Sequence, residues 1–103
     1  MFEDYPHQLP REEALARARA LTEFWDRRLG TRTEWDGYRG HISGRVLGFR
    51  VAGSVSVEED HLRGTLEAGH LGVKLGGRHY LLRKLADYLD PSRSLDELRA
   101  RVP

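Results

Sequence analysis

The chain has 103 residues, of which 32% are charged and 39% are hydrophobic, and 17 basic side chains nearly balance 16 acidic ones. This length fits one domain with a modest core, and a net charge of +1 gives no overall attraction to nucleic acid. The absence of cysteine excludes disulfides, thiolate metal sites and cysteine nucleophiles. No secretion signal is recognisable at the start, and no stretch reaches the roughly 20 apolar residues of a membrane span, so we expect a cytoplasmic protein.

The first predicted element is a helix over residues 10–29. Residues 2–9 before it form too short a segment to assign, although an edge strand there would tolerate Pro6. Pro10 suits a helix start, and Gly30 is a natural stop. Apolar residues recur at spacings of three and four, while Arg17 falls outside their stripe. The stripe consists of Leu15, Ala18, Leu21, Thr22, Trp25 and Leu29.

Alternating apolar and polar residues then predict an antiparallel meander. Its four strands are residues 31–35, 38–43, 45–57 and 61–67. Asp36 and Gly37 form a strong hairpin signal, and Ser43 and Gly44 are predicted as the next turn. The third strand would be about 40 Å long, so we expect a bend or bulge at Gly53.

Helical spacing returns near the end of the chain. Residues 68–77 are rich in glycine and fit either a further strand or a connector. From Arg78 onward, leucines at helical spacing predict a second long helix, and a capping box at Ser94 and Glu97 begins a short terminal helix. Together the elements predict one α+β domain over residues 1–103, with a short helical tail over 91–103. Both long helices, N-terminal and C-terminal, pack on one face of the four-stranded meander.

Several segments resemble the putative polyhydroxyalkanoic acid system protein family, small bacterial proteins named for genes near polyester granule functions. The resemblance covers about residues 5–90. It is carried by His7-Gln8-Leu9-Pro10 before the first helix, Trp35-Asp36-Gly37 at the first hairpin, the glycine-punctuated strand over 48–57, and residues 62–66 before a leucine-rich helix. The resemblance implies an association with polyhydroxyalkanoate granules and implies no catalytic residues.

The titratable residues form no recognisable catalytic or metal-binding pattern. Five histidines are spread along the chain, and no two lie four residues apart on a predicted helix, so we expect no metal site. His7 lies just before the first helix, where we expect a structural bond to the backbone. The carboxylates fall on turns or on helix faces that we expect to be wet, so we expect neither an enzyme nor a cofactor.

The two faces of the predicted sheet differ in character. The outer face carries Arg39, His41, Arg50 and Arg63, either as an interaction surface or as an ordinary solvated face. The inner face carries three glycines where core side chains are expected, and these would form a furrow if the strand registers align. Either helix side chains fill that furrow or an apolar ligand does, and we favour packing. The ligand-binding candidates are Trp25, Gly40, Gly53, Gly64, Leu81 and Leu85.

Two functions are therefore expected. The first is a noncatalytic binding or assembly protein at polyhydroxyalkanoate granules, contacting the granule surface or a granule-associated protein through apolar surface on the second helix and the terminal segment. The second is a carrier of a small hydrophobic, acyl-type ligand in a pocket between sheet and helix. An exposed edge strand on a small sheet also favours homodimerisation.

Overall fold

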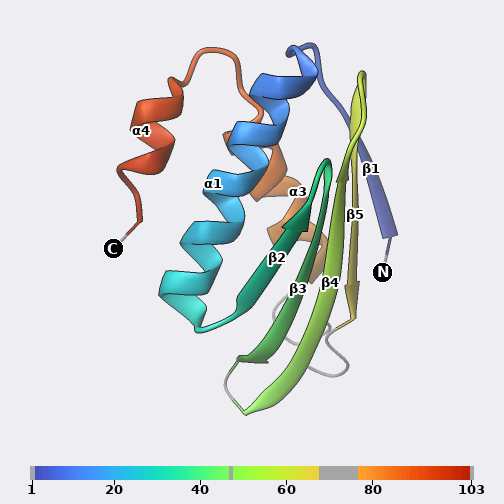
Figure 1. The fold of residues 1–103 in the computed structure, drawn as a ribbon, viewed down its shortest axis with the longest axis vertical. Helices are drawn as coiled ribbons and strands as arrows, with labels where there is room; N and C mark the ends of the chain where they lie inside the picture. Colours follow the sequence, from blue (N-terminus) through green and yellow to red (C-terminus); the bar gives the residue numbers. More distant parts are fainter. Residues whose placement is uncertain (1, 47, 68–76, 103) are drawn as a thin grey trace.

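The computed structural model describes residues 2–46, 48–67 and 77–102 of the chain. Within these residues the elements are, in chain order, β1 (Phe2–Pro6), α1 (Arg11–Leu29), β2 (Arg32–Asp36), β3 (Arg39–Val46), β4 (Phe49–Val57), β5 (His61–Glu67), α3 (Gly77–Tyr88) and α4 (Leu95–Arg99) (Figure 1). The segment predicted as a strand or connector, residues 68–77, lies outside the described residues except for Gly77, with which α3 begins.

The strands form one antiparallel sheet in the order β1-β5-β4-β3-β2. Helices α1 and α3 cover the same face of the sheet, and α4 packs beside α1 (Figure 1). The α+β class is thus confirmed, with both long helices on one face. The predicted count of four strands is wrong, because β1 pairs with β5 as a fifth strand. Its five residues are too few for an alternating pattern to identify.

The turn between β3 and β4, which the sequence predicts at Ser43 and Gly44, lies four residues later in the structure. β3 continues to Val46, and Gly48 takes the positive φ of +82° in the turn that follows. Ser43 and Gly44 are regular strand residues, paired with Ala52 and Val51. The predicted strand over 45–57 is therefore split between β3 and β4.

Gly44 and Gly53, predicted as a turn and as a bend, both lie within paired strands. Gly44 has a φ of +150°, and a Cβ there would lie 3.0 Å from the Cα of Thr31, so this glycine marks a close approach to the start of β2. Gly53 stands opposite Ile42 on one side and Leu66 on the other, in unbroken register. The bend or bulge predicted at Gly53 is therefore absent, because the long strand that required it does not exist.

The predicted caps of α1 and α4 are confirmed. Pro10 immediately precedes α1, and Gly30 closes it in the left-handed conformation, with its N–H donating to the carbonyl of Asp26 at 3.2 Å. The Ser94 side chain accepts from the N–H of Glu97 at 3.1 Å, which is one of the two bonds of the predicted capping box, while the Glu97 carboxylate pairs with Arg93 at 2.9 Å. The described residues include no helix with both the length and the apolar character that a membrane crossing requires.

The core lies between the sheet and the two long helices. α1 contributes small and aromatic side chains, β4 and β5 contribute valines and a leucine, and α3 contributes leucines and a tyrosine. The members with 3% exposure or less are Ala14, Ala18, Ala20, Leu21, Val57, Leu62, Leu85, Tyr88 and Leu98. Most of the apolar side of α3 and Leu98 of α4 belong to the core, which leaves little apolar surface there for the predicted granule contact, and that contact stays a prediction.

Arg17 joins α1 to the far end of α3. The prediction that it lies on the polar side of α1 is wrong, because Arg17 is only 2% exposed. Its guanidinium donates to the carbonyls of Tyr88 at 3.1 Å, Asp90 at 2.8 Å and Arg93 at 2.5 Å, and to the Glu13 carboxylate at 3.2 Å. The last carbonyls of a helix lack hydrogen-bond donors within the helix, and the helix dipole is negative at this end. A guanidinium group supplies both the donors and the positive charge.

Both edges of the sheet are protected against strand addition. On β2, the N–H of Thr33 donates to the Asp26 carboxylate at 3.2 Å, which occupies a backbone donor of the edge. Asp26 also accepts from the hydroxyls of Thr31 and Thr33 at 2.8 Å. On the other edge, β1 ends at Pro6, which has no N–H. Homodimerisation by edge pairing stays a prediction, and these contacts weigh against it.

We expect the Arg17→Met variant to lose about 3 kcal/mol or more of its free energy of unfolding, because several buried carbonyls lose a charged donor. The matched control is Arg27→Met, an exposed position on the same helix, which should cost less than about 1 kcal/mol. Urea denaturation followed by circular dichroism measures both. Equal losses in the two variants would show that the buried guanidinium does not hold α3 against α1.

Candidate functional site

The three inward glycines do not form a continuous furrow. Gly40 on β3 and Gly64 on β5 both stand opposite Val55 of β4, which separates them. Gly53 lies two residues further along β4, between Ile42 and Leu66. Val55 therefore separates Gly40 from Gly64 in one row of the sheet, and Gly53 is the only glycine of the three in its own row.

Side chains from neighbouring elements cover two of these glycines. A Cβ on Gly40 would lie 2.8 to 3.0 Å from ring atoms of Trp35, whose indole N–H donates to the Thr22 hydroxyl at 3.1 Å. A Cβ on Gly64 would meet the Cδ2 of Leu81 at 3.7 Å, an ordinary contact distance. Gly40 thus makes room for an indole, and Gly64 makes room for a leucine of α3.

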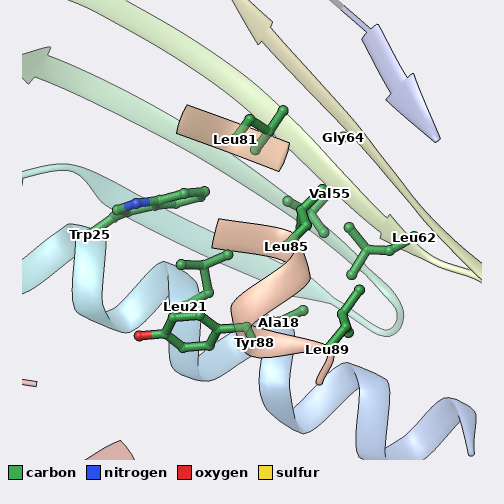
Figure 2. A pocket seen from close by; sticks show the side chains of 10 residues that line it. All are labelled: Ala18, Leu21, Trp25, Val55, Leu62, Gly64, Leu81, Leu85, Tyr88 and Leu89. Atoms are coloured by element: carbon green, nitrogen blue, oxygen red, sulfur yellow. The ribbon is translucent and has the colours of Figure 1, made fainter. Parts of the chain in front are cut away.

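A small cavity remains where α1, α3 and the sheet meet (Figure 2). Its volume is about 10 Å³, close to the space of a single water molecule, whereas ligand pockets span roughly 300–1,000 Å³. Four of the predicted ligand-binding residues line it, namely Trp25, Gly64, Leu81 and Leu85, while Gly40 and Gly53 do not. An acyl chain would enter only if α3 moved away from the sheet.

The contacts at these two glycines predict opposite responses to the same substitution. Gly40→Ala should lower the free energy of unfolding by about 1–3 kcal/mol, because the new methyl group displaces the indole of Trp35. Gly64→Ala should leave it unchanged or raise it by up to about 1 kcal/mol, because the methyl fits and the unfolded chain loses freedom. Thermal or urea unfolding of both variants measures this. A greater loss at Gly64 would contradict the packing described for α3.

The four residues predicted for the outer face do lie on one face of the sheet. In the register, Arg39 and Arg63 stand on either side of Ser56. His41 stands opposite Ser54, and Arg50 lies near the tip of the β3–β4 hairpin. The described helices lie on the other side of the sheet, so within residues 2–46, 48–67 and 77–102 no helix covers this face, which we name the open face (Figure 1).

The centre of the open face is flat and polar. Ser54 and Thr65 are joined side chain to side chain at 2.8 Å across β4 and β5, and Ser43, Ala52 and Ser56 continue the strip of small residues. Short side chains leave the sheet surface accessible to a flat partner. Arginines and a histidine surround this strip, and the same face carries the carboxylates of Glu34, Asp36 and Glu67, which stand opposite His41, Arg39 and Ala52.

The cations of the open face differ in their pairing. Arg63 donates to the Asp4 carboxylate from its Nε at 2.8 Å and from Nη2 at 3.2 Å, and this contact holds the pKa of Asp4 below its usual value. In the part of the chain that the structure describes, Arg39, His41 and Arg50 have no ion-pair or hydrogen-bonding partner of their side chains. These three side chains are exposed and free to meet a partner.

Sequence reasoning missed Arg45 as a member of this face. Arg45 stands directly opposite Arg50, an arrangement of like charges that destabilises a strand pair. The position of the turn is the signal that could have revealed it, since a turn centred on Gly48 places these two arginines across from each other.

The other titratable groups near the sheet have structural partners. His7 is 8% exposed, its Nε2 lies 3.0 Å from the Glu58 carbonyl, and its Nδ1 accepts from the N–H of Leu9 at 3.2 Å. The predicted structural bond of His7 to the backbone is thus confirmed. The Tyr38 hydroxyl donates to the Glu12 carboxylate, and this hydrogen bond raises the pKa of the phenol above its ordinary value.

Comparisons with protein-family models, curated proteins and solved structures found no significant match to this chain. In residues 2–46, 48–67 and 77–102, no group of three or more histidine, aspartate or glutamate side chains is placed to hold a metal ion. The open face is therefore the feature of the described chain that bears most directly on function.

Proposed function

We propose that this chain is a small noncatalytic binding or assembly protein that associates with polyhydroxyalkanoate granules. The observation that carries the proposal is the open face of the sheet, a flat strip of short side chains. Arg39, His41 and Arg50 stand on this face without side-chain partners in the described chain, beside the carboxylates of Glu34, Asp36 and Glu67. Such a face suits a broad partner surface that carries negative charge. The sequence resemblance to the polyhydroxyalkanoic acid system family supplies the identity of the partner.

Two features support binding in preference to chemistry. Both ring nitrogens of His7 are occupied by backbone groups, and Tyr38 is held as a hydrogen-bond donor. Neither is therefore free to move a proton to or from a substrate. The contact surface of the proposal is the open face, because the apolar residues of α3 and α4 lie in the core.

The second candidate is a carrier of a small hydrophobic ligand. Its support is the apolar lining of the cavity between α1, α3 and the sheet. It requires α3 to separate from the sheet, against the bonds that Arg17 makes to the end of that helix. The binding function needs no such rearrangement and is the one that the geometry supports better.

We expect the protein to cofractionate with polyester granules from a producing cell. The Arg39→Glu variant should bind the granules at least about tenfold more weakly, because like charges across an interface repel strongly. The matched control is Arg83→Glu, which makes the same charge change at an exposed position on α3. Quantitative immunoblotting of granule and soluble fractions measures the distribution. A protein that stays in the soluble fraction beside abundant granules would contradict the proposal, as would equal losses in both variants.

A further inference from the structure

Charge is distributed unevenly between the two ends of the molecule. The turn between β4 and β5 carries Glu58, Glu59 and Asp60, and Glu12 lies nearby at the start of α1. The tip of the β3–β4 hairpin lies at the opposite end, beyond the last turn of α1 (Figure 1). The acidic turn has cations beside it, since Arg11 pairs with Glu58 and His61 pairs with Asp60. The arginines at the hairpin tip have no such partners among the described residues.

The basic end combines two elements, and we name it the hairpin end. Its residues are Arg27, Arg28 and Leu29 in the last turn of α1, and Arg45, Phe49 and Arg50 at the tip of the hairpin. The two elements are neighbours, because Gly44 of β3 lies against Gly30 and Thr31, which directly follow α1. In the described part of the chain, the four arginines have no partner for their guanidinium groups.

The hairpin end also gathers exposed apolar side chains. Phe49 is 40% exposed and Leu29 is 38% exposed, and these are the exposed large hydrophobic residues of the described chain. β3 and β4 extend beyond their pairing with β2, and Val46 and Phe49 pair with each other on this ribbon, with no third described strand beside them. Arg45 and Arg50 occupy its other side. The ribbon thus has an apolar and a cationic side at its free tip.

We infer that the hairpin end is a docking surface for an anionic phospholipid interface. The unpaired arginines match phosphate head groups in charge, while Phe49 and Leu29 reach the acyl region beneath them. The phosphates of a nucleic acid would pair with the arginines, but a nucleic acid offers no apolar region in which the aliphatic side chain of Leu29 could be buried. The opposed Arg45 and Arg50 destabilise the free protein, and an anionic surface removes that repulsion.

The test uses the purified full chain and vesicles of phosphatidylcholine, with or without an equal share of phosphatidylglycerol. We expect cosedimentation with the anionic vesicles only, weakening as salt rises. The R45Q/R50Q double variant should lower the partition coefficient roughly 30-fold, since each arginine near such a surface contributes about fivefold. Phe49→Ser should lower it about tenfold at every salt concentration.

The matched control is R83Q/R99Q, which removes the same charge from exposed positions on α3 and α4. It should bind as the unmodified protein does, and thermal melting shows whether each variant is folded. Equal weakening in both double variants, binding to random-sequence duplex DNA in place of vesicles, or no vesicle binding at low salt would overturn the inference. The inference is independent of the proposed function. Cofractionation with granules but no binding to vesicles would overturn the lipid inference alone. Binding to vesicles but no cofractionation with granules would overturn the granule association alone.

Discussion

The arrangement of this protein depends on one buried cation. Arg17 lies in the interior of α1, yet its guanidinium reaches the backbone carbonyls at the end of α3 and in the loop that follows. A charge in this position is costly unless its donors find acceptors. The Nη1 and Nη2 groups donate to the carbonyls of Tyr88, the last residue of α3, and of Asp90 and Arg93 in the loop after it, whereas the buried Nε has no hydrogen-bond partner among the described residues. The contact therefore fixes where α3 ends relative to α1. The leucines of α3 are held over the sheet as a result.

With α3 held in place, the described side chains between α1, α3 and the sheet leave little internal space. Leu81 fills the space above Gly64, Trp35 fills the space above Gly40, and the remaining cavity has room for about one water. A chain of this size needs almost all of its apolar residues for one core. Binding at the open face and at the hairpin end uses exposed residues that the core does not require.

The sequence predicted the elements and faces better than their pairing. Side chains alternate between the two faces of a strand whatever the turn, so Arg39, His41, Arg50 and Arg63 were placed on the correct face. Pairing depends on the turn, and Ser43-Gly44 imitates a hairpin signal, whereas β3 continues to Val46 and the turn contains Gly48. Arg17 could not be recognised as buried, because its acceptors are backbone atoms more than 70 residues away.

The central claim is that a partner binds at the surface while the core between α3 and the sheet stays packed. Its most direct test is nuclear magnetic resonance of the labelled protein during titration with isolated polyester granules or anionic vesicles. It follows the amides of β3 and β4 together with the methyl groups of Val55, Leu81 and Leu85. The account predicts broadening of the amides at the open face and hairpin end while these methyl resonances stay in place. Shifts concentrated in the three sets of methyl groups would contradict it, since they would show that α3 opens and the partner enters the core.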